Sequence, residues 1–294
     1  MRRTKLVLLA AASLVASLVA GLVAMAAPVA AQNGEAQNGD GLRYVALGDS
    51  YTAAPLVPQI IPAGGCFQST HNYPHLLAAA LQPAVFVDAS CSGAQTRDMF
   101  ASQMSGVAPQ LDAVTPDTDL VTLSIGGNDS SVFGTLVGYC TQLVATGPDA
   151  APCRDEMRSS GGDRLFQAVA LTQDRVVAVI EAIKDRAPDA RIIVVGYPQI
   201  APRHGSCPAL LPLAAGDLRY ANQVNQRLTL ALRHAAARQH VEYVDVWRAS
   251  QGHDICSADP WINGQHTDVT RAQAFHPFAE EQAAVADLVL AELG

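Results

Sequence analysis

The sequence has little positive charge. Its 294 residues hold 19 Lys and Arg against 27 Asp and Glu, which gives a formal net charge of −8 at pH 7. A surface with this balance does not attract phosphate backbones or anionic lipid headgroups. Nucleic acid and anionic lipid surfaces are therefore excluded as main partners.

Acidic residues are also absent from the first 34 positions. Three basic residues within the first five positions precede an apolar stretch from Leu6 to Met25, and Val29-Ala30-Ala31 matches a signal-peptidase site. We predict that residues 1–31 are a signal peptide and that the mature protein is secreted, with a formal charge of about −11. An uncleaved N-terminal membrane anchor is the alternative. After cleavage no stable membrane insertion is expected.

Residues 32–41 lack apolar character. They contain two copies of Gln-Asn-Gly and end at Gly41, so we predict a flexible N-terminal segment. The remaining residues, 42–294, show no internal repeat and no composition break. We interpret them as one domain and expect a monomer.

The cysteines lack the CxxC spacing that is typical of zinc sites. An even number of cysteines in an exported chain predicts disulfides, although the sequence alone leaves their connectivity open. The simplest connectivity is sequential and closes short to moderate loops. We predict this pairing: Cys66–Cys91, Cys140–Cys153 and Cys207–Cys256. We expect no metal and no cofactor.

Apolar runs of strand length alternate with helical patterns along the mature chain. Strands are predicted at 44–47, 84–89, 118–125, 191–196 and 241–246, and helices at 73–81, 163–186, 217–238 and 277–292. Residues 132–162 are expected to be irregular. The alternation predicts an α/β fold, a three-layer α/β/α sandwich with a five-stranded parallel sheet. Ligands bind outside the carboxyl ends of the strands in such sheets.

Four residues with chemical potential follow predicted strands or precede the last helix: Ser50, Gly93, Asn128 and His276. Each has a simpler structural explanation, because Ser and Asn cap helices, Gly and Asn form turns, and His276 precedes Pro277 at a helix start. Together they supply the parts of acyl transfer. These are a hydroxyl nucleophile, a base and donors for a developing oxyanion.

The sequence blocks around these residues resemble those of the SGNH (GDSL-type) serine hydrolases, in family order. The blocks are Gly48-Asp49-Ser50, CSGAQT around Gly93, GGND at 126–129 and FHP around His276. The resemblance implies the flavodoxin-like SGNH-hydrolase fold and a secreted esterase or lipase of actinobacterial type. It also implies Ser50 as nucleophile and His276 as base. The oxyanion hole would consist of the Ser50 and Gly93 N–H groups and the Asn128 side-chain amide.

One position departs from the family pattern. The family usually places an aspartate three residues before the histidine, where this chain has Gln273. Some members orient the histidine with a backbone carbonyl at that position instead. We therefore predict that the Gln273 carbonyl orients His276, with Asp268 as the second choice.

The expected substrate is a small-molecule or lipid ester. Leu56, Ile60, Ile61 and the run 209–213 are candidates to line an acyl groove, or to pack their loops onto the domain. The absence of GxSxG excludes an α/β-hydrolase nucleophile elbow, and the absence of clustered Asp and His ligands argues against a binuclear phosphoesterase. A carbohydrate O-acetyl esterase and a non-catalytic envelope binding protein stay open as alternatives.

Overall fold

The computed structural model of the protein describes residues 41–62, 64–159 and 161–294. The predicted signal peptide, residues 1–31, and nearly all of the predicted flexible segment lie outside this part of the chain. Within the described residues, no helix combines the length and the apolar character needed to cross a membrane.

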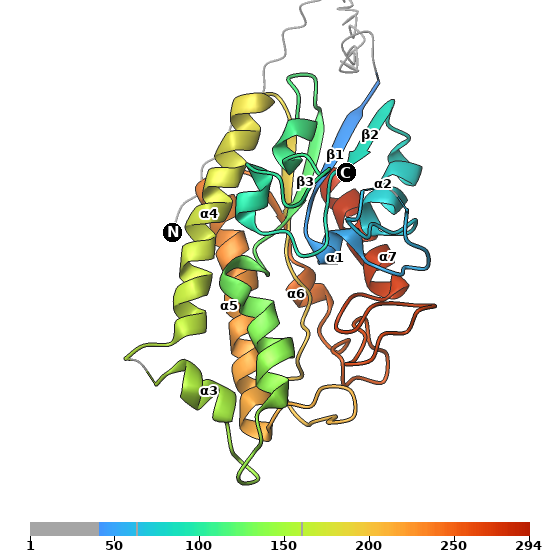
Figure 1. Cartoon of the computed structure of the whole chain (residues 1–294). Coiled ribbons are helices and arrows are strands. Elements are labelled where there is room, and N and C mark those ends of the chain that lie inside the picture. The colour runs from blue at the N-terminus through green and yellow to red at the C-terminus, as the bar shows by residue number, and fades with distance from the viewer. Residues whose placement is uncertain (1–40, 63, 160) are drawn as a thin grey trace, which may run out of the picture. The chain divides into compact units, whose positions relative to one another are not determined.

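One sheet of parallel strands forms the centre of the domain (Figure 1). Its strand order is β2-β1-β3-β4-β5. The strands are β1 (Arg43–Gly48), β2 (Val85–Asp88), β3 (Leu120–Ser124), β4 (Arg191–Val195) and β5 (Glu242–Val244). The predicted five-stranded parallel sheet is confirmed. All carboxyl ends of the strands therefore meet at one edge.

Helices cover both faces of the sheet. Tyr44 and Ala46 of β1 join the core beneath α2 (Tyr73–Leu81) and α7 (Ala279–Leu293). Val45 and Leu47 face the opposite core, beneath α4 (Arg164–Arg186) and α5 (Ala215–Arg238). Alternate residues of a strand point to opposite faces of the sheet. Because helices cover both faces, both sets of side chains are apolar and buried. The three predicted layers are thus present.

Capping residues set the starts of the helices that the sequence predicts best. The Asn72 side chain accepts from the His75 N–H at the start of α2, and the Asp163 side chain accepts from the Phe166 N–H at the start of α4. The last helix begins two residues later than predicted. Its expected first residue, Pro277, instead forms an antiparallel bridge with Ile262.

Short helical segments occupy the connections. Three are α-helices, α1 (Ser50–Ala53), α3 (Pro152–Met157) and α6 (Val246–Ala249). Four are 3-10 turns, η1 (Thr96–Met99), η2 (Gln110–Ala113), η3 (Asp129–Ser131) and η5 (Cys140–Gln142), and η4 (Gly134–Tyr139) is a π-helix. The prediction that residues 132–162 are irregular is therefore wrong in part.

Three disulfides join the loops, Cys66–Cys91, Cys140–Cys153 and Cys207–Cys256. These are the sequential pairs that the sequence predicts. The first of these bridges connects the loop after α1 to the turn after β2.

Candidate active site

The turn after β1 presents Ser50 at the carboxyl edge of the sheet. Asp49 caps α1, and Ser50 is its first residue and is buried. The turn requires glycine at position 48, because a Cβ there would lie 2.1 Å from Thr52 Oγ1 and 2.8 Å from the Ser124 carbonyl oxygen. The close packing of Gly48, at the end of β1, against Thr52 of α1 therefore fixes the position of Ser50.

The buried carboxylate of Asp49 links this turn to the turn after β3. Its Oδ1 accepts from the Tyr51 N–H at 2.9 Å and its Oδ2 from the Tyr197 hydroxyl at 2.5 Å. The same hydroxyl accepts from the Gly127 N–H at 2.9 Å. Burial raises the pKa of Asp49 to about 7, although these hydrogen bonds lower it in part. No residue pattern pointed to Tyr197, which lies 148 positions from Asp49 in the sequence.

Gly93 and Asn128 approach each other from the turns after β2 and β3. Gly93 has φ +80°, a conformation that glycine adopts without steric cost. The Asn128 Nδ2 donates to the Ala94 carbonyl at 3.1 Å, which uses one of its two amide hydrogens. Gly93 is also tied to β1, because the Cys91 N–H donates to the Gly48 carbonyl at 3.0 Å.

The carbonyl that contacts the His276 ring belongs to Ala274 and not to Gln273. His276 Nδ1 lies 2.7 Å from the Ala274 carbonyl oxygen. The Gln273 carbonyl instead accepts from the His276 N–H and from Asn263 Nδ2, both at 3.2 Å. The prediction of Gln273 is therefore corrected. The physical reason is a tight turn whose third residue, Phe275, has φ +59°, so that the Ala274 carbonyl faces the imidazole.

Tyr51 supports this turn from the other side. Its ring stacks on the His276 ring with centroids 5.8 Å apart, and its hydroxyl donates to the Phe275 carbonyl at 2.9 Å.

Asp268, the second choice for orienting His276, accepts instead from the Thr270 N–H and hydroxyl at 2.9 and 2.6 Å. Burial lowers the pKa of the His276 imidazole, and the hydrogen bond to the backbone raises it in part.

Ser50, Gly93, Asn128 and His276 line one cleft of about 580 Å³. Of the predicted groove residues, Leu56 and Ile60 line it as well, together with Pro55, Gly65, Phe67, Ser92, Met104, Thr267 and Gln273. The run 209–213 does not, because Leu211 and Leu213 are buried in the core on the α4–α5 face. Among the residues that the structure describes, no Asp, Glu, Lys or Arg lines the cleft.

The arrangement can position an ester between a hydroxyl, an imidazole and amide donors. Among residues 41–62, 64–159 and 161–294, no group of three or more His, Cys, Asp or Glu side chains is placed to hold a metal ion. A fixed amide at Asn128 and a glycine with an accessible backbone are suited to stabilising an oxyanion.

Comparison with known proteins gives consistent matches. The family model described as "GDSL-like Lipase/Acylhydrolase family" matches residues 46–284. The chain is 41% identical over 262 residues to Lipase 2 of Streptomyces coelicolor, which covers 88% of this chain and 85% of that protein. It is 32% identical over 265 residues to Lipase 1 of the same organism, with 88% and 89% covered.

Two solved structures share the fold at appreciable sequence identity. Phospholipase A1 from Streptomyces albidoflavus superposes with a TM-score of 0.71 at 30% identity, over 86% of this chain and 99% of that chain. The extracellular lipase from Streptomyces rimosus gives a TM-score of 0.70 at 30% identity, over 85% and 99%.

Proposed function

The chain belongs to the GDSL-like lipase/acylhydrolase family and is a carboxylic ester hydrolase, and we propose that it acts through an acyl-enzyme on Ser50 with His276 as general base. The observation that carries this proposal is the single cleft lined by Ser50, Gly93, Asn128 and His276, which come from four separate segments of the chain.

The first half-reaction forms the acyl-enzyme. The Ser50 Oγ attacks the ester carbonyl carbon while His276 Nε2 takes its proton. The carbonyl oxygen becomes an oxyanion that accepts from the N–H groups of Ser50 and Gly93 and from Asn128 Nδ2. When the tetrahedral intermediate collapses, His276 returns the proton to the leaving alkoxide.

The second half-reaction regenerates the enzyme. His276 takes a proton from a water molecule, which attacks the acyl carbonyl carbon, and then protonates Ser50 Oγ as the carboxylic acid leaves. Each half-reaction starts with a neutral His276 imidazole. Burial favours this neutral form because it lowers the pKa of His276. The contact between Nδ1 and the Ala274 carbonyl fixes the tautomer, with the proton on Nδ1 and the lone pair on Nε2.

We also propose that the protein is secreted. Three disulfides fit an oxidising compartment, and one of the similar proteins is an extracellular lipase. The mature protein would begin after residue 31. The N-terminal sequence of the protein recovered from culture medium tests this expectation.

The proposed mechanism and substrate are tested with p-nitrophenyl esters from acetate to palmitate. The full mature chain is expected to hydrolyse them, and Ser50→Ala to lose about a thousandfold or more in kcat/KM. Activity that survives in Ser50→Ala contradicts the mechanism. Activity confined to acetate favours a carbohydrate O-acetyl esterase.

A further inference from the structure

Two large apolar side chains are exposed at the edge of the cleft. Phe67 and Met104 both line it, yet they are 51% and 39% exposed. Phe67 has φ +57°, a left-handed conformation that is unusual for an aromatic residue. Such strain persists only where the surroundings impose it, and it is concentrated at functional sites.

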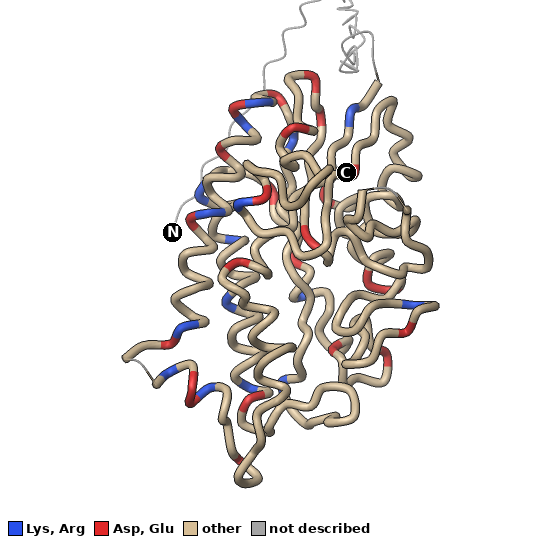
Figure 2. Tube along the Cα trace, viewed as in Figure 1, with Lys and Arg blue, Asp and Glu red and all other residues tan. Residues whose placement is uncertain are grey.

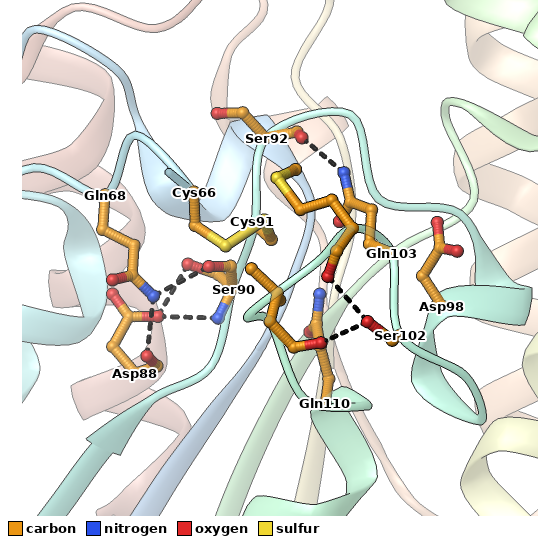
Figure 3. Close-up of a disulfide and its surroundings, with 12 residues drawn as sticks. Cys66, Gln68, Asp88, Ser90, Cys91, Ser92, Asp98, Ser102, Gln103 and Gln110 are labelled. Atoms are coloured by element: carbon orange, nitrogen blue, oxygen red, sulfur yellow. Dashed lines mark hydrogen bonds between the residues drawn. A yellow bond between two sulfur atoms is a disulfide. The ribbon is translucent and has the colours of Figure 1, made fainter. Parts of the chain in front are cut away.

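The backbone around Phe67 is fixed on both sides (Figure 3). Cys66 is bonded to Cys91, and the Gln68 side chain donates to the carbonyl groups of Asp88 and Ser90, both at 2.7 Å. The aromatic ring is therefore held at the cleft edge by a rigid support and does not belong to a loosely tethered loop.

Met104 is fixed in a comparable way. The Ser102 hydroxyl contacts the carbonyl groups of Met104 and Val107 at 2.7 and 2.6 Å, and the Gln103 side chain donates to the Ser92 carbonyl at 2.8 Å (Figure 3). Both exposed side chains thus lie on turns tied to the same disulfide-bonded segment.

The stretch of chain that carries Phe67 has no charged side chain. The 38 residues from Ser50 to Val87 include no Asp, Glu, Lys or Arg. The described part of the tube is accordingly tan, neither blue nor red, over α1, the following loop and α2 (Figure 2). The two histidines of this stretch, His71 and His75, do not line the cleft. Charges lie instead on the loop before His276 and at the start of α7, where Arg271 and Glu280 form an ion pair at 3.2 Å.

We propose that Phe67 and Met104 dock the enzyme on an uncharged surface of packed ester lipid, so that the cleft opens onto its substrate. Burying these side chains there removes apolar area from water without desolvating a charge. An anionic lipid surface would repel the mature chain, whose formal net charge is about −11. This inference rests on the proposed function, and it makes the substrate a lipid in an aggregate rather than a dispersed ester or an acetylated polysaccharide.

Binding is tested with Ser50→Ala as background, which prevents hydrolysis. The full mature chain is mixed with vesicles of phosphatidylcholine, and the bound fraction is measured by flotation. We expect binding, and we expect Phe67→Asn combined with Met104→Gln to weaken it by about tenfold or more. Asparagine suits position 67 because it tolerates the left-handed conformation. Leu171→Gln, at a side chain of α4 that is 55% exposed, is the matched control and should bind normally.

Kinetics provide the second arm, in the active enzyme. The ratio of the rate on an emulsified long-chain ester to the rate on dissolved p-nitrophenyl acetate should fall about tenfold in the double variant and stay unchanged in Leu171→Gln. Three outcomes would each overturn the proposal. The double variant could lose both rates equally, it could bind vesicles as well as the parent, or the parent could bind phosphatidylglycerol vesicles more strongly than phosphatidylcholine vesicles. Hydrolysis that does not depend on Ser50 would instead refute the proposed mechanism.

Discussion

Within the described part of the chain, His276 is held by backbone and aromatic contacts, and no carboxylate contacts its ring. The Ala274 carbonyl contacts Nδ1, the Tyr51 ring stacks on the imidazole, and the Tyr51 hydroxyl holds the Phe275 carbonyl. Tyr51 follows Ser50 directly in the chain, so a single short helix positions both members of the proposed dyad. We regard Tyr51 as a positioning residue for the base.

Tyr51→Phe tests that role through the pH profile. Loss of the hydroxyl frees the turn, which admits water to His276 and allows its pKa to rise toward the ordinary value. Because the base must be neutral, the acidic limb of kcat/KM should shift to higher pH, and kcat should fall by about tenfold with little change in KM. Tyr44→Phe removes a buried hydroxyl that contacts Thr122 at 2.8 Å, away from the cleft, and serves as the control. An unchanged pH profile in Tyr51→Phe would remove Tyr51 from this role.

The residue types of the site could be predicted from sequence, but their supports could not. Ser50, Gly93, Asn128 and His276 stand in recognisable blocks at strand and helix ends. Which carbonyl faces the imidazole depends on one backbone dihedral angle, that of Phe275, and no residue pattern encodes it. The residue that fixes Asp49, Tyr197, is distant in sequence and becomes its neighbour only through the order of the strands.

Among the connecting elements, the disulfide-bonded turn after β2 matters most for the site. Cys91 lies two residues before Gly93, its N–H donates to Gly48, and the Cys66 carbonyl accepts from the Ser92 N–H at 2.9 Å. The bridge therefore fixes the proposed oxyanion glycine relative to the nucleophile turn.

Removal of the Cys66–Cys91 bridge by serine substitutions should lower kcat by about tenfold, because the Gly93 N–H loses its alignment. Removal of Cys140–Cys153 is the matched control. Both variants should lose stability by about 2–4 kcal/mol, since each bridge restricts the unfolded chain. Thermal unfolding and p-nitrophenyl ester kinetics measure the two effects. Equal kcat values in the two variants would show that the first bridge has no special role in the site.

At the level of elements, strongly periodic segments were predictable and weakly patterned ones were not. The bounds of α2 match the prediction, and α4 differs by one residue, because both combine an apolar stripe with a side-chain cap. The π-helix η4 and the short α3 gave no such signal within 132–162. The apolar run 209–213 suggested a groove, but Leu211 and Leu213 pack into the core, which apolar composition alone cannot distinguish.

The stability of the whole molecule should depend on two buried carboxyl groups. Burial raises the pKa of Asp49 to about 7 and that of Glu281, in the first turn of α7, to about 8. The unfolded chain releases these protons near the ordinary carboxyl pKa, whereas the native state retains them to higher pH. Since the native state binds more protons in that interval, its stability should decrease as the pH rises from about 5 to 8.

Glu281→Gln should reduce this dependence. The new amide stays neutral, and its oxygen can accept from Gln282 Nε2 as the carboxyl does now at 2.6 Å. We expect the variant to be more stable than the parent by about 1–3 kcal/mol at pH 8 and similar to it at pH 5. Asp287→Asn, at an exposed position of the same helix, is the control. Urea unfolding at both pH values gives the comparison, and a parallel decrease of both proteins with pH would contradict the assignment to Glu281.

The most direct test of the central claim is to map a fluorophosphonate adduct by tandem mass spectrometry on the full mature chain. We predict one phosphonylated residue, Ser50, and loss of ester hydrolysis in proportion to its labelling. We also expect labelling to be slower by about 100-fold or more in His276→Ala, which lacks the base. An adduct on another residue would contradict the role of Ser50 as nucleophile. So would an excess of probe that leaves Ser50 unmodified and hydrolytic activity undiminished.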